Sequence, residues 1–127
     1  MSIDLPGFAD PVAGAQSCFR AVLAAMATPG SVHPAGEGLA PPAPLGAAMA
    51  AVLLSLVDGD TTLALEGDCA AARDWLVFHC GAPVTDASAE AAFVAAHRLP
   101  DLATLRTGSD EAPEDAATLL LEVAAFG

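Results

Sequence analysis

An almost unbroken apolar stretch near the middle of the chain most constrains what this sequence can fold into. Residues 47–57 contain one polar side chain, Ser55. The stretch is far shorter than the ~20 apolar residues that a helix needs to cross a bilayer. Its large side chains and the preceding leucine share one face at helical spacing: Leu45, Met49, Val52, Leu53 and Leu56. Alanine covers most of the rest, so segment 45–57 is predicted to be a buried helix.

A second helix is predicted over residues 11–27. Asp10 is a good N-cap, and Pro11 takes the first helical position, where the missing N–H of proline costs nothing. The Thr-Pro-Gly sequence at 28–30 ends the helix, because proline lacks a donor for the helix ladder and glycine accepts a positive φ. A single apolar stripe follows the 3.6-residue period: Val12, Ala15, Phe19, Val22, Leu23 and Met26.

The remaining segments predict short elements that alternate along the chain. Asp68 is expected to cap a third helix over 69–79, and a helical turn is expected near 102–105. Residues 1–9 are predicted to form an extended arm and 35–44 a loop. Short runs of apolar or β-branched residues predict strands at 31–33, 61–65, 90–95 and, as a buried strand, 118–126. Helices that alternate with strands predict a layered α/β fold, and 127 residues suit a single domain, 1–127.

The charge balance excludes two classes of partner. Four basic residues, all arginine, stand against 16 acidic residues, which gives a net charge of −12. A nucleic-acid-binding protein needs several cations to displace counterions from phosphates, and an anionic membrane surface repels such an acidic chain. The amino terminus has no basic segment followed by an apolar run, so we expect a cytoplasmic protein without a signal peptide.

Cofactor and metal sites are not expected from the motifs. The three cysteines, Cys18, Cys69 and Cys80, form no C-x-x-C pair, so neither a disulfide framework nor a zinc site is predicted, and each is expected to be a small buried side chain. The chain has no phosphate-binding glycine loop. It also has no lysine, which excludes a pyridoxal phosphate Schiff base.

Arg20 and His79 are the two weak candidates for a catalytic role. Arg20 lies in the middle of the 11–27 helix beside the apolar stripe, and its guanidinium suits a phosphate or a carboxylate. The favoured alternative is an ion pair with a carboxylate such as Asp58 or with a partner chain. His79 stands beside the thiol of Cys80, but neighbours on a helix do not face each other. A helix-end histidine, whose charge suits the C-terminal dipole, is therefore favoured.

The other ionisable residues give no catalytic set. His33 and His97 stand alone in the sequence and are not expected to bind a metal. Asp58 and Asp60 lie in an Asp-Gly-Asp turn, where aspartate is expected to bond the backbone. The acidic residues of 111–115 predict a solvated loop. The residues alone therefore indicate an acidic α/β domain with no convincing active site.

Taken in order, several segments resemble the PhnH subunit of bacterial carbon-phosphorus lyase. The resemblance runs from Phe8 to Phe126 and is carried by Pro11-Val12-x-x-Ala15-Gln16-x-x-Phe19-Arg20, Met26-Ala27-x-Pro29-Gly30, Ala43-Pro44-Leu45, Leu56-x-Asp58-x-Asp60-Thr61, Phe78-His79-x-Gly81-Ala82-Pro83, Ala92-Phe93 and Gly108-x-x-x-x-Pro113-x-x-x-Ala117-Thr118-Leu119. Each segment alone is weak, but their order and spacing are fairly specific.

The resemblance implies a fold and a set of partners. The fold is expected to be similar to the large domain of pyridoxal-phosphate-dependent transferases without the cofactor, and the chain is expected to form a homodimer. Proteins of this family act with partner subunits of the G, I and J types. Family members usually continue for roughly another third of a chain, so the C-terminal part of the family fold is expected to be missing. No catalytic residue carries over from the family to a position here.

The implied function is an accessory, non-catalytic role in alkylphosphonate degradation. The machinery joins an alkylphosphonate to the ribose of a nucleoside triphosphate with loss of the base, forming ribose 1-alkylphosphonate 5-triphosphate. The alternatives are an independent small anion-handling enzyme that uses Arg20 and His79, and a plain dimerisation module. Because of the net charge, we expect the chain alone to bind nucleotide or phosphonate no better than about millimolar. Partner subunits would supply the cations, with Arg20 contributing at an interface.

Overall fold

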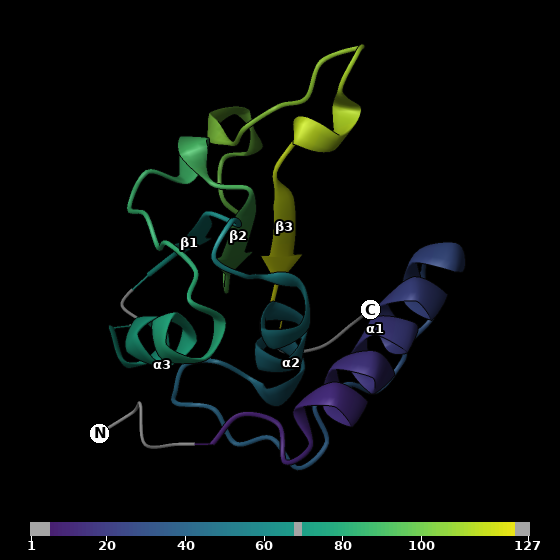
Figure 1. The fold of residues 1–127 in the computed structure, drawn as a ribbon. Helices are drawn as coiled ribbons and strands as arrows, with labels where there is room; N and C mark the ends of the chain where they lie inside the picture. Colours follow the sequence, from purple (N-terminus) through teal and green to yellow (C-terminus); the bar gives the residue numbers. More distant parts are fainter. Residues whose placement is uncertain (1–5, 68–69, 124–127) are drawn as a thin grey trace.

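The computed structural model describes residues 6–67 and 70–123, and these form a mixed α/β structure. Within these ranges, three helices and three strands follow one another (Figure 1): α1 (Pro11–Ala27), α2 (Ala47–Leu56), β1 (Leu63–Leu65), α3 (Ala70–Cys80), β2 (Phe93–Ala96) and β3 (Thr118–Leu121). Single 3₁₀ turns occur at Ser88–Glu90, Leu102–Thr104 and Pro113–Asp115. The α/β class expected from the alternating pattern is confirmed, and no helix in the described ranges has the length and apolarity to cross a membrane.

The three strands form one parallel sheet in the order β1-β2-β3. Leu65 pairs with Ala95, and Ala95 pairs with Leu120. The sequence left the order and direction of the strands open. Because the strands are parallel, their carboxyl ends meet at one edge of the sheet, and the residues that follow them are brought together there.

The two faces of the sheet pack against different parts of the chain. Leu63, Ala95 and Leu120 belong to the main core, which also contains Leu53 of α2 and Trp75 of α3, both 0% exposed. The alternate strand residues point the other way, as the period of two requires. They form a second, smaller cluster covered by the segment that connects β2 to β3: Ala64, Ala91, Val94, Leu105, Ala117 and Leu119.

Helix α1 begins and ends where the sequence predicts, but most of its apolar stripe is exposed to solvent. The Asp10 carboxylate accepts a hydrogen bond from the N–H of Ala13 at 3.1 Å, and Gly30 has φ 92° after the helix end. The helix packs against α2, with Cys18 buried at the contact. Most of the stripe nevertheless faces solvent, with exposed fractions of 68% for Val12, 48% for Phe19, 51% for Leu23 and 74% for Met26.

Several predicted elements need correction. Residues 31–33 form no strand. The strand predicted at 90–95 begins only at Phe93, because a 3₁₀ turn occupies Ser88–Glu90. The strand predicted at 118–126 ends at Leu121. It is half exposed rather than buried, since β3 is an outer strand with a neighbour on one side only. The cap at Asp68, most of the arm at 1–9 and the end of the last predicted strand lie outside the described residues.

Candidate functional site

Arg20 lies on the exposed surface of α1 and is not paired with Asp58. Within the described ranges, its guanidinium makes no hydrogen bond or ion pair. Asp58 instead closes its own turn, as the Asp-Gly-Asp pattern predicts: its Oδ1 accepts from the N–H of Asp60 and from the hydroxyl of Thr61, each at 2.9 Å. These two hydrogen bonds lower the pKa of Asp58. The intramolecular Arg20–Asp58 pair is therefore not formed.

His79 and Cys80 form the end of α3, as the sequence indicates. The His79 ring stands edge-on to Trp75 at 4.9 Å between ring centroids. Cys80 is half-buried and donates its S–H to the carbonyl of Leu53 on α2 at 3.7 Å. Burial, aided by the negative charge of Asp58, raises the pKa of Cys80 to about 11. The thiol is therefore protonated at neutral pH, which does not suit a nucleophile.

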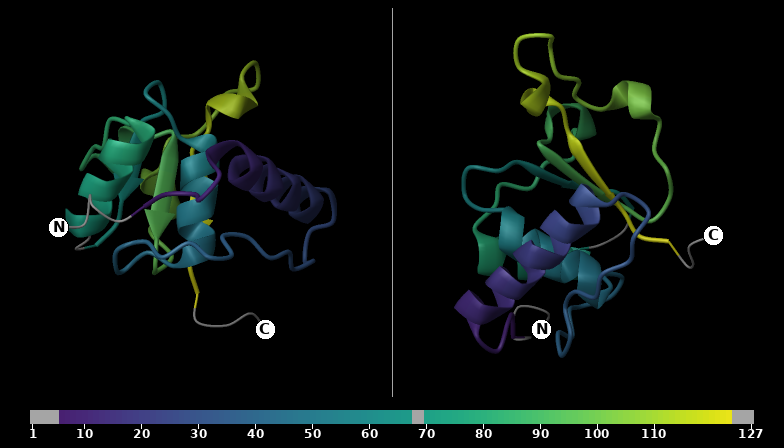
Figure 2. Two further views of the ribbon diagram at one scale, coloured as in Figure 1. Left: turned by 60° about the horizontal axis from the view of Figure 1, so that its bottom comes forward. Right: turned by 90° about the vertical axis from the view of Figure 1, so that its right-hand side faces the viewer.

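The fold does not bring Arg20 and His79 together. Helices α1 and α3 lie on opposite sides of α2, as Figure 1 and the left view of Figure 2 show. Neither residue lines the cleft at the sheet edge that is described below.

Polar residues follow all three strands at the carboxyl edge of the sheet. Glu66 comes directly after β1, His97 and Arg98 after β2, and Glu122 after β3. Because Ala96 pairs with Leu121, His97 and Glu122 are the next residues in the same register. The carboxyl edge of a parallel sheet is where α/β proteins usually bind ligands. The position therefore makes this cluster the strongest candidate site among the described residues.

His97 and Glu122 form a directly bonded pair at this edge. Nε2 of His97 lies 2.6 Å from Oε2 of Glu122 and 3.0 Å from the carbonyl oxygen of Pro44. The other oxygen of Glu122, Oε1, accepts the N–H of Gly46 at 2.9 Å, where α2 begins. Helix α2 and strands β2 and β3 thus hold the pair together.

The bonding pattern fixes which ring nitrogen carries a proton. Both neighbours of Nε2 are acceptors, a carboxylate and a carbonyl, so Nε2 carries the hydrogen. Nδ1 has no hydrogen-bond partner in the described part of the chain. A neutral His97 therefore presents Nδ1 as an acceptor, in the arrangement of a general base oriented by a carboxylate.

An open cleft of about 360 Å³ borders this pair, lined by Pro44, Glu66, Gly67, His97, Arg98, Leu99 and Pro100. Arg98 makes no hydrogen bond or ion pair with the described residues. Two of the other arginines are engaged elsewhere, Arg73 with Asp86 at 2.6 Å and Arg106 with the carbonyl of Asp115 at 2.7 Å. Arg98 is thus a cation placed at the cleft and available to an incoming group.

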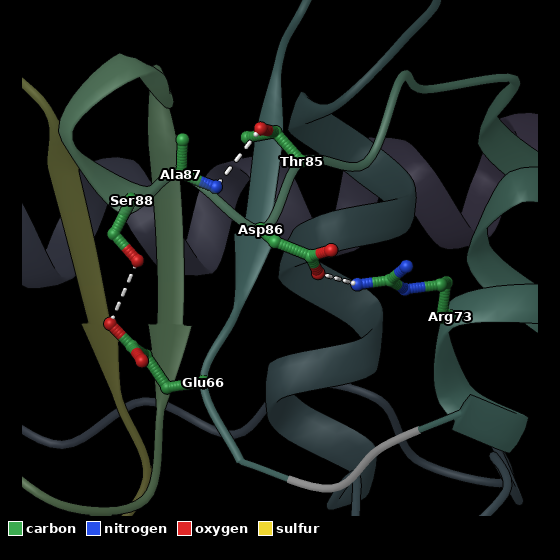
Figure 3. Close-up of polar contacts among 6 residues, drawn as sticks. All are labelled: Glu66, Arg73, Thr85, Asp86, Ala87 and Ser88. Carbon is green, nitrogen blue, oxygen red and sulfur yellow. Dashed lines mark hydrogen bonds and ion pairs between the residues drawn. The ribbon is translucent and has the colours of Figure 1, made fainter.

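Glu66 supplies a negative charge to the same cleft. Its Oε1 accepts the hydroxyl of Ser88 at 2.9 Å, which ties the end of β1 to the turn before β2 (Figure 3). In the same region Arg73 of α3 reaches Asp86, and the Thr85 hydroxyl accepts the N–H of Ala87 at 3.1 Å. These contacts hold segment 85–88 against both α3 and β1.

Sequence reasoning missed this cluster for a definite reason. His97 was expected to stand alone, because Glu122 is 25 positions away in the sequence and only the parallel register makes them neighbours. A signal was nevertheless present: Glu66, His97 and Glu122 each follow an apolar run directly. No group of three or more potential metal ligands exists in the described ranges, and Cys18 and Cys80 are free thiols there.

Comparisons with known proteins agree with the motif pattern. The family model described as bacterial phosphonate metabolism protein (PhnH) matches residues 6–127. A curated relative from Rhizobium meliloti (strain 1021), named alpha-D-ribose 1-methylphosphonate 5-triphosphate synthase subunit PhnH, is 40% identical over 124 residues. The match covers 94% of this chain, and the chain spans 62% of the length of that relative. The chain therefore belongs to the PhnH family of bacterial phosphonate metabolism proteins.

Proposed function

We propose that this chain is an accessory subunit of the machinery that forms ribose 1-alkylphosphonate 5-triphosphate during alkylphosphonate degradation. The observation that carries the proposal is the 40% identity to a protein named as a subunit of the corresponding methylphosphonate synthase. The family match over residues 6–127 supports the same role. The partners would be subunits of the G, I and J types.

The charge of the chain favours an accessory role. A triphosphate and a phosphonate together need several cations, whereas this chain has four arginines, two of which are engaged. Its net charge of −12 repels such ligands at long range. Partner subunits would therefore supply most of the cations, and Arg20, bare on α1, would contribute if it lies at an interface.

Reconstitution tests the proposal. The purified chain alone, mixed with a nucleoside triphosphate and methylphosphonate, should release no base. Co-expressed with the three partner subunits, it should co-purify with them and support base release. Base release by the chain alone would overturn the accessory role in favour of an independent enzyme. Arg20→Ala and His79→Ala variants would then show whether those two residues carry the activity.

The exposed stripe of α1 supports the expected homodimer. Val12, Phe19, Leu23 and Met26 place large apolar side chains in solvent along one helix, a pattern typical of an interaction surface. Light scattering at micromolar concentration should give a dimeric mass, and Phe19→Asp should lower it. A monomeric mass for the unmodified chain would contradict self-association and, with it, the plain dimerisation module.

The remaining expectations follow from the family. The sheet would correspond to part of a fold similar to the large domain of pyridoxal-phosphate-dependent transferases, within a single domain. The protein would act in the cytoplasm without a cofactor. The co-purification described above also tests whether these 127 residues are enough to join the partner subunits.

A further inference from the structure

We propose that the cleft at the carboxyl edge of the sheet binds a tetrahedral oxyanion that retains a proton, with Arg98 holding the anion and Nδ1 of His97 accepting its hydrogen. The inference goes beyond the proposed subunit role, because it assigns a ligand site to this chain's own residues. It rests on three observations: a guanidinium and a ring nitrogen that each have no partner among residues 6–67 and 70–123, and a cleft that both residues line.

The tautomer of His97 determines which anion fits. Nε2 already donates to Glu122 and faces the carbonyl of Pro44, so a neutral ring has only an acceptor left for a ligand. A fully deprotonated anion offers only lone pairs to that nitrogen, whereas an anion that retains a proton donates a hydrogen bond to it. The ring therefore selects for a protonated oxyanion.

The charges around the cleft also favour an oxyanion that retains a proton. Arg98 presents a guanidinium, which matches the paired oxygens of a phosphoryl or phosphonyl group. Glu66 lines the cleft as well and disfavours added negative charge. One cation beside one carboxylate gives weak binding, so we expect a dissociation constant of about 1–10 mM.

Glycine at position 46 helps to position the Glu122 carboxylate beside His97. A Cβ at this position would overlap Oε1 of Glu122, so only glycine lets the carboxylate approach the start of α2. The Gly46 N–H then holds Oε1, which leaves Oε2 aimed at the histidine. The backbone thus fixes the carboxylate, and the carboxylate fixes the tautomer.

Titration with two anions of the same shape tests the proposal. Inorganic phosphate retains a proton at pH 7.5, whereas sulfate does not. In the full chain, the ring signals of His97 should shift saturably with phosphate, and sulfate at equal ionic strength should bind at least about fivefold more weakly. Equal affinity for both anions would overturn the proposal. The absence of a saturable shift with phosphate up to about 50 mM, which is 50-fold above the lower limit of the expected dissociation constant, would also overturn it.

Variants separate this site from other basic surfaces. Arg98→Gln should weaken phosphate binding about tenfold, the usual effect of losing a hydrogen bond to a charged group. Arg20→Gln is the matched control, because it removes the same charge from an exposed arginine that does not line the cleft, and it should leave binding unchanged. A loss of binding in the Arg20 variant, with none in the Arg98 variant, would overturn the assignment.

Glu122→Gln tests the role of the tautomer directly. The Gly46 N–H should hold the amide oxygen, which turns the amide nitrogen toward Nε2 and favours the Nδ1–H form of His97. ¹⁵N shifts of the ring should report Nε2–H in the unmodified chain and more Nδ1–H in the variant. The preference for phosphate over sulfate should then fall to parity or reverse. An unchanged preference together with a changed tautomer would refute the mechanism.

Two further ligands identify where the oxyanion comes from. Methylphosphonate and ribose 5-phosphate carry the same tetrahedral group, one on a methyl carbon and one on a sugar, and both are compared with inorganic phosphate at about pH 6, where a large share of each ligand retains a proton. A lower dissociation constant for one of them than for inorganic phosphate would assign the site to that ligand class. Because these titrations use the chain alone, their outcome is independent of whether it co-purifies with the lyase subunits.

Discussion

Helices α1 and α2 are both rich in apolar residues, yet they have opposite surroundings. In α2 the side chains of Met49, Ala50, Ala51 and Leu53 are buried, whereas in α1 only Cys18 is. Helix α2 lies between α1 and α3 and packs on both, so the remaining residues of α2 are half-buried, apart from the exposed Ala48 (Figure 2). The difference shows that an apolar stripe predicts a helix and leaves open whether the stripe faces the core or solvent.

The two helices also begin differently. Helix α1 is capped by its own neighbour in sequence, Asp10, through a local hydrogen bond to the backbone. Helix α2 begins at Gly46, which has no cap from nearby side chains and is held by Glu122, 76 positions away in the sequence. The start of α2 is therefore coupled to the sheet edge and to His97, while the cap of α1 is a local contact between Asp10 and Ala13.

The largest effect is expected from truncating a buried side chain of α2. Leu53→Ala should lower the free energy of unfolding by about 2–5 kcal/mol, because Leu53 is 0% exposed and its truncation leaves a cavity in the main core. Leu23→Ala on α1 is the matched control and should cost less than about 1 kcal/mol. Urea denaturation of both variants measures the difference. Equal losses would show that the α1 stripe is covered in solution.

Adding one methyl group at the start of α2 should have the next largest effect. Gly46→Ala displaces the Glu122 carboxylate and should cost about 1–3 kcal/mol through the loss of its hydrogen bond to the Gly46 N–H. The matched control is Gly59→Ala, where the nearest heavy atom to an added Cβ is 3.7 Å away. Thermal unfolding with ¹⁵N shifts of His97 measures both effects. An unchanged His97 tautomer in Gly46→Ala would break the proposed coupling.

Removing the cap of α1 should have a smaller and purely local effect. Asp10→Ala should lower the free energy of unfolding by about 1 kcal/mol, because the Ala13 N–H loses its acceptor. Asp10→Asn should retain most of the stability, since an amide oxygen still caps the helix. Chemical shifts at the sheet edge should not change in either variant. A change there would show that the two helix starts are coupled.

The smallest effect at neutral pH concerns the thiol that links α3 to α2. Burial raises the pKa of Cys80 to about 11, so the fold favours the protonated thiol. The associated stability is complete below the unfolded pKa of the thiol and is lost as pH rises toward 11. The chain has no lysine and no tyrosine, so cysteines are the only side chains with ordinary pKa values in this window.

Melting temperatures at pH 8 and pH 10.5 measure this loss. Cys80→Ala should show a smaller decrease between the two pH values than the unmodified chain. Alkylation mapped by mass spectrometry should also be slower at Cys80 in the folded chain at pH 8 than in urea. Rapid alkylation of folded Cys80 would contradict the burial of its thiol.

The sequence by itself determined the local features of this protein. The limits of α1, the Asp58 turn, the helical turn at 102–105 and the α/β class all depend on residues close together in the chain, and each was predictable. The ordered motifs also indicated the PhnH family, which the family match confirms.

Only the tertiary structure decided which of these features face one another. The parallel register places Glu122 beside His97, and the packing leaves the α1 stripe exposed while it buries Met49, Ala50, Ala51 and Leu53 of α2. Both outcomes depend on contacts between residues far apart in the chain, and the period of an apolar pattern carries no information about such partners. Local hydrogen bonds fixed the elements, and long-range packing fixed the candidate site.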